Sequence, residues 1–516
     1  MDVLGACLLE SVPWLLGAAF CFGVAAAPGW RATRRDALAL AGLTVASLAY
    51  RTLVFPAVYF HQNGQGPLWI ERAIVGNADD YGPGVIELFH GAIALSRKDP
   101  ERAVFAVQGL LAAATPACAW LLARRAGADR LLAWVLAAAV AFDPMLARLS
   151  RSESYFGTGA SLLFLAAATL CLPATRAPVK SARFVLACCA AAMIIAQAAR
   201  LQPILWVASA LTPLVLLVGE GALRRRLRAA LAASAMIAVV VVLSSAEAMW
   251  HAFHSDLSAR MSEYLHRGFE QRCIAHLRWL MPLGALAVAT SQRRLRALLH
   301  LPLIPVVVAV ADWADFFAAT QQRAWIQAGY TRLYAPAAVV LAAALLRGAS
   351  GTRARAMAVA GAVALALLAG AALRWRDYTT IPTDALEQNL ARGWTRSLPY
   401  NTRVAFHCRA ASLTLLLPVY PSIDPLGHQT HCIDVARPPE ERLLAHGVSY
   451  YYRSSACSTQ EAQPHCDGLE RLYALEPVAA WTLPAISSYF VGYERATVRV
   501  ALFRVTSARR PHAARR

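Results

Sequence analysis

Two short stretches of the chain gather acidic and basic side chains that could handle a phosphate ester. Residues 77–84 read Asn-Ala-Asp-Asp-Tyr-Gly-Pro-Gly and include the neighbouring carboxylates Asp79 and Asp80. Residues 143–155 contain two arginines, a glutamate and a terminal tyrosine. An aspartate can accept a hydroxyl proton or hold a divalent cation, and a guanidinium binds phosphate through charge-assisted hydrogen bonds. These residue types could therefore provide a base or cation site beside a site that binds phosphate.

The aspartate pair is the candidate base or cation site. The candidate substrate ligands lie in the second stretch or near later helix ends, and they are Arg148, Arg151, Tyr155, Arg200 and Arg332. Each group also has a simpler explanation. Two aspartates beside Gly-Pro are ordinary loop chemistry, arginines at helix ends snorkel towards water, and interfacial tyrosines form aromatic belts.

Long apolar runs around these stretches predict that membrane-spanning helices position them. The 516 residues are 58% apolar and only 16% charged, which is too apolar for an ordinary soluble protein. A helix needs ~20 apolar residues to cross the hydrocarbon core, and the chain has about twelve such runs. We expect spans at residues 4–27, 37–59, 103–122, 131–149, 156–172, 182–198, 203–219, 227–246, 277–290, 298–312, 333–346 and 356–373.

The charge pattern predicts how these spans are oriented. The net charge is +19, and basic residues concentrate in alternate loops at 31–35, 124–130, 176–183, 224–228, 293–296 and 347–355. By the positive-inside rule these loops are cytoplasmic, so everything after Arg374 lies outside. We expect a multi-pass protein of a bacterial inner (plasma) membrane, surrounded by membrane lipids, with no nucleic-acid partner. Because no Lys or Arg precedes the first span, that span is expected to be retained and not cleaved as a signal peptide.

The fold class expected is an α-helical polytopic membrane protein with a small C-terminal α/β extracytoplasmic domain. Residues 1–376 form the transmembrane domain, with structured outer loops at 61–102, 249–278 and 313–332, and residues 377–516 form the periplasmic domain. Mixed polar and apolar segments in the second domain predict helices at 384–392 and 440–446 and strands at 403–406, 448–452 and 497–505.

Four cysteines fall in the expected periplasmic domain: Cys408, Cys432, Cys457 and Cys466. An oxidising compartment favours two disulfides, and of the three pairings we prefer the first with the second and the third with the fourth. A metal site is the alternative, because His407, His431 and His465 each directly precede a cysteine. Adjacent residues of an extended strand point to opposite faces, which argues against that alternative.

Four segments of the chain resemble motifs of one enzyme family. Residues 142–155 resemble the P-hydrophobic-R-x-S-R-E-x-R-x-Y pattern of the GT-C glycosyltransferases. Residues 81–89 resemble the family's Y-x-P-P-L-Y segment, residues 199–203 its R-x-Q-P helix junction, and residues 330–336 its R-Y-x-x-P segment. This superfamily of integral-membrane enzymes includes the protein O-mannosyltransferases and the aminoarabinose transferases of lipid A, which use polyprenyl-phosphate sugars.

The resemblance implies an inverting glycosyltransferase. It would move a sugar from a polyprenyl-phosphate donor to an acceptor, which could be a lipid, a glycan or a protein, at the periplasmic face. The family usually has an acidic residue just after the helix that precedes the first outer loop, where this chain has residues 61–67, His-Gln-Asn-Gly-Gln-Gly-Pro. The nearest carboxylates are Glu71, Asp79 and Asp80, and we assign the role to the aspartate pair.

Two other functions remain open at this point. A transporter or flippase for lipid-linked sugars would be built from related halves with broken helices. A membrane anchor for a periplasmic binding domain is the third possibility, although a dozen spans exceed what anchoring needs. No nucleotide-phosphate loop, HExxH pair or Gly-x-Ser-x-Gly motif occurs in the sequence.

Overall fold

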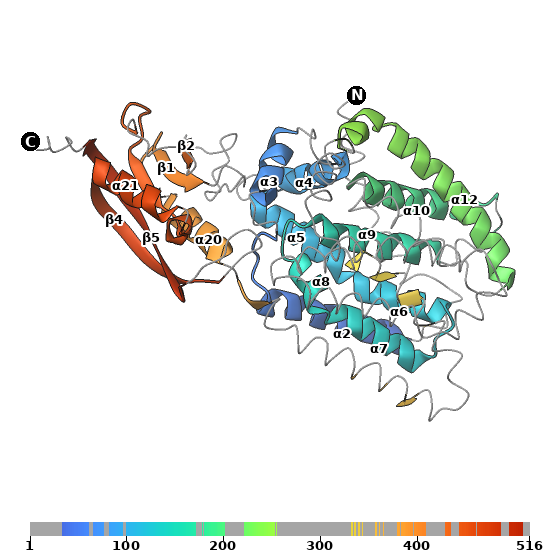
Figure 1. Cartoon of the computed structure of the whole chain (residues 1–516). Helices are drawn as coiled ribbons and strands as arrows, with labels where there is room; N and C mark the ends of the chain where they lie inside the picture. Colours follow the sequence, from blue (N-terminus) through green and yellow to red (C-terminus); the bar gives the residue numbers. More distant parts are fainter. Residues whose placement is uncertain are drawn as a thin grey trace, which may run out of the picture. The chain divides into compact units, whose positions relative to one another are not determined.

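The structure is a computed structural model of the whole chain (Figure 1). It describes residues 34–60, 65–76, 82–95, 100–171, 178, 180–201, 221–252, 254, 332–333, 335–336, 339–340, 343, 357–358, 361, 365, 379–381, 383–395, 397–408, 429–434, 443–460, 462–486 and 495–508. The chain divides into two compact units, which we describe separately. The helical unit comprises Met1–Ala57, Gly76–Thr320 and Ala324–Thr379, and the sheet unit comprises Val58–Val75, Gln321–Arg323 and Thr380–Arg516.

Apolar α-helices make up the described part of the helical unit. They are α2 (Arg34–Val54), α4 (Pro83–Leu95), α5 (Pro100–Ala113), α6 (Thr115–Arg125), α7 (Arg130–Ala141), α8 (Pro144–Leu149), α9 (Tyr155–Leu170), α10 (Ala182–Leu201) and α12 (Gly221–Leu243). Helices α5 and α6 together, and α10 alone, are long and apolar enough to cross a membrane. A third span results if residues Arg228–Leu243 of α12 and residues Ala246–Ala252, which meet at 77°, count as one. The chain is an α-helical membrane protein.

Several expected spans cannot be compared with the structure. Those at 4–27, 203–219, 277–290 and 298–312 lie outside the described residues, and those at 333–346 and 356–373 are described only at isolated positions. Helix α4 lies within the outer loop expected at 61–102. It packs against α5 and α10, and most of its side chains are buried.

The expectation of one continuous helix over residues 131–149 is wrong. Helix α7 ends at Ala141, and a new helix, α8, begins at Pro144. Asp143 starts α8 as its N-cap, because a side-chain oxygen accepts a hydrogen bond from the Leu146 amide at 2.7 Å. An Asp-Pro pair favours this break, since the residue before proline avoids the helical conformation and proline suits the first helical position. The break leaves the polar stretch after Asp143 outside the long helix α7.

Helix α9 lies at the centre of the helical unit. All of its residues are buried, and it contacts α5, α6, α8 and α10 (Figure 1). Gly157 allows its close approach to α8, because a Cβ atom there would lie 2.9 Å from the Leu149 carbonyl oxygen. The Ser161 hydroxyl donates to the Gly157 carbonyl at 2.8 Å, so this buried polar group is satisfied. The first turn of α9 is thereby held against the stretch that contains the candidate arginines.

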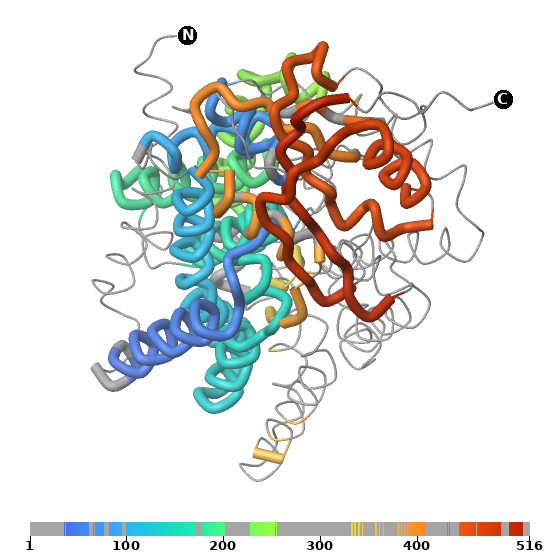
Figure 2. Tube along the Cα trace, turned by 90° about the vertical axis from the view of Figure 1, so that its left-hand side faces the viewer, coloured from blue at the N-terminus to red at the C-terminus, as the bar shows by residue number. Residues whose placement is uncertain are grey.

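The sheet unit contains a five-stranded mixed sheet with the order β2-β1-β3-β5-β4. The strands are β1 (Arg403–Cys408), β2 (Gln429–Asp434), β3 (Tyr450–Arg453), β4 (Tyr473–Pro484) and β5 (Thr497–Ala508). Strand β1 runs parallel to β2 and β3, whereas β5 runs antiparallel to β3 and β4. Figure 2 shows the two long strands β4 and β5 in red, side by side.

Helix α20 (Thr383–Thr395), the 3₁₀ turn η3 (Ser455–Ser458) and helix α21 (Gln463–Leu472) contact this sheet. Helix α3 (Gln65–Val75) is assigned to the same unit. Side chains alternate along β1, because Val404 and Phe406 pack in one apolar cluster with Trp394 of α20, whereas Ala405 packs in a second cluster with Leu469 of α21. This two-residue alternation is the expected geometry of a strand that is covered on both faces.

The sequence predicted some of these elements and missed others. The helix expected at 384–392 and the strands expected at 403–406, 448–452 and 497–505 correspond to α20, β1, β3 and β5. The helix expected at 440–446 is not formed where the structure describes it, because residues 443–447 are turns that end at Gly447 with φ of 69°. Helix α3, strands β2 and β4 and helix α21 were not predicted.

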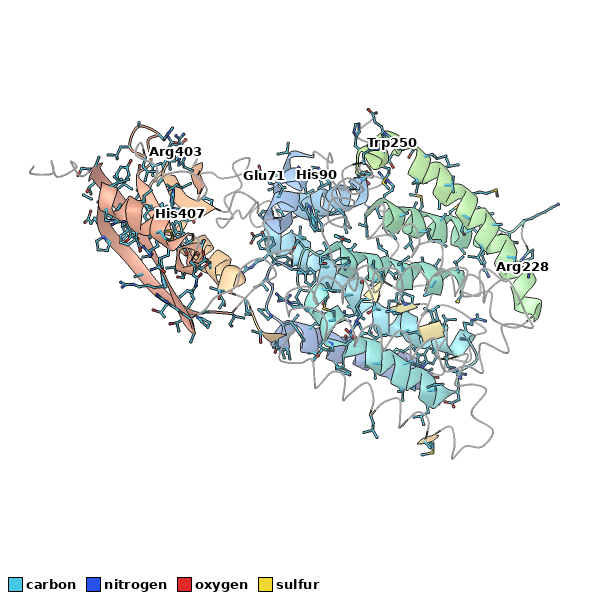
Figure 3. The ribbon with its side chains drawn as sticks, viewed as in Figure 1. Glu71, His90, Arg228, Trp250, Arg403 and His407 are labelled. Carbon is cyan, nitrogen blue, oxygen red and sulfur yellow. A yellow bond between two sulfur atoms is a disulfide. The ribbon has the colours of Figure 1, made fainter. Side chains whose placement is uncertain are left out.

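A buried histidine makes the stability of the sheet unit depend on pH. His407 lies on β1 (Figure 3) and is fully buried. Burial lowers its pKa to about 3, with smaller contributions from the charges of His465 and Arg453. The unfolded chain therefore binds a proton at higher pH than the folded chain does. The stabilisation from neutral His407 is complete above the ordinary pKa of about 6.5 and is lost as the pH falls towards 3.

We expect the free energy of unfolding of the sheet unit to fall by about 1.4 kcal/mol per pH unit within that window, the slope for uptake of one proton. Hydrogen exchange of the β1 and β3 amides in the full chain, corrected for intrinsic rates, would measure it. His407→Gln should flatten the slope, and His446→Gln, at an exposed position, should leave it unchanged. An unchanged slope in His407→Gln would show that another group controls acid unfolding.

Candidate functional site

Two of the motif segments meet where α4 begins and α10 ends. The Arg200 guanidinium forms an ion pair with Glu87 of α4, and its Nε donates to the Ser245 hydroxyl at 2.9 Å. One turn earlier on α10, the Gln197 amide donates to the Gly84 carbonyl at 3.0 Å. The Arg200 side chain is only 4% exposed, whereas that of Glu87 is 30% exposed. The contacts fix the segment that starts α4 against the carboxyl end of α10.

The Gly-Pro-Gly sequence allows this contact at the backbone level. A Cβ atom on Gly82 would lie 2.1 Å from the Arg200 carbonyl oxygen and 2.8 Å from that of Leu201. A Cβ atom on Gly84 would lie 2.9 Å from the Arg200 carbonyl carbon. Only glycine lets the two backbones approach so closely.

Gly82→Ala should destabilise the helical unit by about 2 kcal/mol, because the added methyl group would collide with backbone atoms that cannot rotate away. Gly42→Ala is the matched control. Gly42 lies in α2, and a Cβ atom there would meet nothing within 4 Å. The control should be neutral or slightly stabilising, since alanine is the better helix former. Equilibrium unfolding in mixed micelles would compare the two variants, and equal stability would argue against the close approach.

The other two motif segments meet through Asp143 and Arg332. The Arg332 Nε lies 3.2 Å and 3.1 Å from the two Asp143 oxygens, and its Nη2 lies 3.1 Å from Oδ2. The same carboxylate caps α8. Both side chains are mostly buried, with 14% of Arg332 and 23% of Asp143 exposed. This ion pair links the loop between α7 and α8 to a segment far along the chain.

The turn between α8 and α9 is polar in sequence but buried in the structure. Ser150, Ser152, Glu153 and Ser154 are all fully buried. Buried polar groups need partners, and two serines find theirs in the last residues of α8. The Ser150 hydroxyl donates to the Ala147 carbonyl at 2.7 Å, and the Ser152 hydroxyl donates to the Leu149 carbonyl at 2.9 Å. Hydrogen bonds to the end of α8 therefore hold this buried turn.

Two candidate arginines of this region hold the segment that follows α2. Arg148 is buried, and its Nη1 donates to the Pro56 carbonyl at 3.3 Å, while the Arg151 Nε donates to the Phe55 carbonyl at 3.3 Å. Glu153 is close enough to Arg148 to act on it electrostatically. Tyr155 is also buried, at the start of α9 beside Phe156. Arg148 and Arg151 thus hold two adjacent carbonyl groups of one backbone segment.

The structure also identifies polar residues that our sequence interpretation missed. Gln108 of α5 donates to the Ser154 carbonyl at 3.1 Å and accepts from the Thr158 hydroxyl at 2.6 Å. Arg51 of α2 is 1% exposed and donates to Thr115 at 3.4 Å. Both lie inside expected spans, where a polar or ionisable side chain is costly and signals a specific role. That signal was available in the sequence.

The candidate residues do not all lie in the described part of the chain. Asp79 and Asp80, expected to act as base or cation ligand, precede the described residue Gly82 and lie outside the described residues. Arg200 and Arg332 each pair with a carboxylate. A phosphate bound by either guanidinium would have to share it with Glu87 or Asp143.

Comparison with family models and with curated proteins gives no match. Among solved structures, the chain is similar to ArnT from Cupriavidus metallidurans in the apo state, with 15% identity, a TM-score of 0.48, and coverage of 90% of this chain and 97% of that chain. It is also similar to the oligosaccharyltransferase AglB from Archaeoglobus fulgidus, with 11% identity, a TM-score of 0.40 and coverage of 92% and 77%.

A third similar structure is the arabinofuranosyltransferase AftD from Mycobacteria, with 14% identity, a TM-score of 0.42 and coverage of 92% of this chain and 41% of that chain. All three TM-scores lie below 0.5. The solved structures that the chain resembles belong to the family that its sequence motifs resemble, the GT-C glycosyltransferases.

Proposed function

We propose that the chain is an inverting GT-C glycosyltransferase, which moves a sugar from a polyprenyl-phosphate donor to an acceptor at the periplasmic face of a bacterial inner membrane. One observation carries the proposal. The four motif-like segments, which are far apart in sequence, join in two pairs through Arg200 with Glu87 and Arg332 with Asp143. Contact between segments that resemble motifs of one family supports a common site for each pair.

The chemistry needs few groups. A polyprenyl phosphate leaves as a stable anion, so the reaction does not require the general acid that glycoside hydrolysis needs. Asp79 or Asp80 would accept the proton of the acceptor hydroxyl or hold a divalent cation. Guanidinium groups among Arg148, Arg151, Arg200 and Arg332, with Tyr155, would position the donor phosphate.

The surface of α12 fits the proposed orientation. Arg228 lies near one end of this helix, and the exposed Trp250 lies beyond the other end (Figure 3). Between them, α12 exposes Met236, Val239 and Val240. Cations favour the cytoplasmic end of a span, and tryptophan favours the membrane interface. The end near Trp250 would then be periplasmic. Ser245 lies five residues before Trp250 and accepts a hydrogen bond from Arg200, so Arg200 would lie near the same end.

The test measures free undecaprenyl phosphate, because any sugar and any acceptor would leave this product. Membranes that contain the full chain would be supplied with a panel of undecaprenyl-phosphate sugars and analysed by mass spectrometry. We expect Asp79→Asn/Asp80→Asn to lower the release by about 100-fold or more, the usual contribution of a general base. Glu247→Gln, an exposed change, should retain activity. Full release by the double variant would refute the role of the aspartates.

A flippase for lipid-linked sugars is the second candidate. The 77° bend between Leu243 and Ala246 favours it, because transporters use broken helices. In the same membranes, a flippase would move the donor between leaflets and leave its sugar attached. Movement without release of undecaprenyl phosphate would therefore replace the glycosyltransferase proposal.

A further inference from the structure

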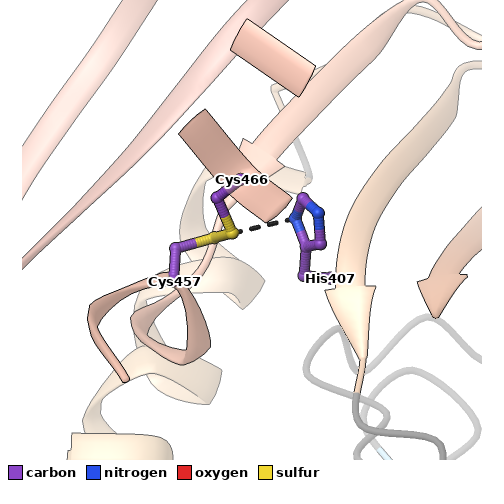
Figure 4. A group of neighbouring side chains, drawn as sticks. All are labelled: His407, Cys457 and Cys466. Atoms are coloured by element: carbon purple, nitrogen blue, oxygen red, sulfur yellow. Dashed lines mark hydrogen bonds between the residues drawn. A yellow bond between two sulfur atoms is a disulfide. The ribbon is translucent and has the colours of Figure 1, made fainter. Parts of the chain in front are cut away.

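A second cluster of reactive side chains lies in the core of the sheet unit. It contains His407 of β1, Tyr451 of β3, Cys457 of η3, and His465 and Cys466 of α21. All are fully buried except His465, which is 8% exposed. Cys457 and Cys466 form a disulfide, with an S–S distance of 2.07 Å. Figure 4 shows the His407 ring facing the two sulfur atoms.

The donor atoms of this cluster already have spacings that suit a tetrahedral zinc ion. The His407 Nδ1 lies 3.6 Å from the Cys457 Sγ, and the Tyr451 hydroxyl lies 3.1 Å from that nitrogen and 3.7 Å from that sulfur. Zinc bond lengths place tetrahedral nitrogen–sulfur, nitrogen–oxygen and oxygen–sulfur neighbours roughly 3.6, 3.4 and 3.5 Å apart. The single bond between the sulfurs is the feature that excludes an ion.

His465 provides separate support for a metal site. Its Nδ1 lies 2.8 Å from the His407 Nε2, and its buried Nε2 has no hydrogen-bond partner among the described residues. If His407 carries its proton on Nε2 and donates it to His465, the Nδ1 lone pair points towards the tyrosine hydroxyl and the sulfurs. Histidines that bind metals are held in this way, through a hydrogen bond from the other ring nitrogen.

We propose that reduction of the Cys457–Cys466 disulfide opens a zinc site formed by these two sulfurs and the His407 Nδ1, with the Tyr451 hydroxyl as the nearest fourth donor. His465 would orient the His407 ring. The proposal is independent of the glycosyltransferase activity. A dithiol reductant gives two electrons and two protons to the disulfide and itself becomes a disulfide, which leaves two thiols on the chain.

Binding of zinc then releases one proton from each thiol. Two thiolates neutralise the charge of Zn²⁺, so the buried site carries no net charge and avoids the cost of an isolated buried ion. The two Cα atoms are 5.8 Å apart, so rotation about the Cα–Cβ bonds can separate the sulfurs. The domain would thus hold either a disulfide or a metal ion, according to its redox state.

The test uses the full chain in detergent. The protein would be reduced with a water-soluble phosphine, freed of reductant without oxygen, and titrated with Co²⁺, which gives a thiolate-to-cobalt absorption band. We expect about one additional Co²⁺ per chain after reduction, relative to the oxidised protein, and loss of the band when Zn²⁺ is added. A disulfide that the phosphine does not open, or a reduced protein without the band, would overturn the proposal.

Substitutions test whether the cobalt absorption band arises from these residues. Cys457→Ser/Cys466→Ser and His407→Ala should abolish it, and His465→Phe should weaken binding about 10-fold to 100-fold, the usual effect of a residue that orients a ligand. Cys188→Ser/Cys189→Ser, in α10, and Cys408→Ser/Cys432→Ser should retain the band. A band that survives in Cys457→Ser/Cys466→Ser would disprove the assignment.

A measurement on the unaltered chain tests the site even if some variants fail to fold. In the reduced protein, Zn²⁺ should protect Cys457 and Cys466 from alkylation, as identified by mass spectrometry of peptides, and should not protect Cys189. Equal alkylation of the two cysteines with and without Zn²⁺ would contradict the proposal.

Discussion

Glu87→Leu should destabilise the helical unit by about 3 kcal/mol, because it leaves the buried guanidinium of Arg200 without its carboxylate. Arg200 is 4% exposed, and the Ser245 hydroxyl at 2.9 Å is neutral and cannot replace a negative charge. If Arg200 positions the donor, the rate of sugar transfer by Glu87→Leu should also fall. Unfolding in mixed micelles, with Glu247→Leu as an exposed control, would measure the loss.

A double-mutant cycle separates the ion pair from the rest of the site. Arg200→Met should be less damaging in a Glu87→Leu background than alone, because removal of both charges leaves no buried charge uncompensated. The expected interaction energy is about 1 to 3 kcal/mol. Additive single effects would mean that Glu87 and Arg200 are not coupled, which would contradict one of the two contacts that support the proposed function.

Asp143→Ala should cost about 3 kcal/mol, the sum of an ion pair and a helix cap. Asp143→Asn should cost about 2 kcal/mol, since an amide oxygen still caps α8 but cannot neutralise Arg332. The two substitutions therefore divide the role of Asp143 into its contact with the Leu146 amide and its contact with Arg332. Thermal or denaturant unfolding of the full chain would measure both.

Asp129 is the matched control for this comparison. It caps α7 through the Leu132 amide at 2.8 Å and has no ion-pair partner in the described part of the chain. Asp129→Ala should cost about 1 kcal/mol, and Asp129→Asn should cost almost nothing. If the asparagine variants at 129 and 143 behave alike, the contact between Asp143 and Arg332 contributes no stability.

Features that depend on residues close together in the sequence could be predicted from the sequence. The apolar runs predicted α2, α9 and α10 with ends within a few residues, because hydropathy is a local property. Asp143 and Pro144 also signal a break, but they lie inside an apolar run, and hydropathy alone does not show the break. Strand β4 was missed, because its alternating residues include two prolines and a glutamate that weaken the strand pattern.

The partners of the charged side chains could not be predicted in the same way. The sequence placed Arg200 and Arg332 at helix ends as cations that could bind phosphate. Tertiary structure pairs the first with Glu87, 113 residues away, and the second with Asp143, 189 residues away. These contacts depend on how helices pack, and packing joins residues whose sequence separation carries no signal of contact.

The sequence alone therefore determined that the chain crosses a membrane as helices and carries family-like motifs, because length, hydropathy and local spacing contain that information. Only the tertiary structure decided that the motifs meet in pairs and that His407 faces the Cys457–Cys466 disulfide. The physical reason is that an ion pair or a cluster of ligands exists only after distant backbone segments have been brought within a few ångströms of each other.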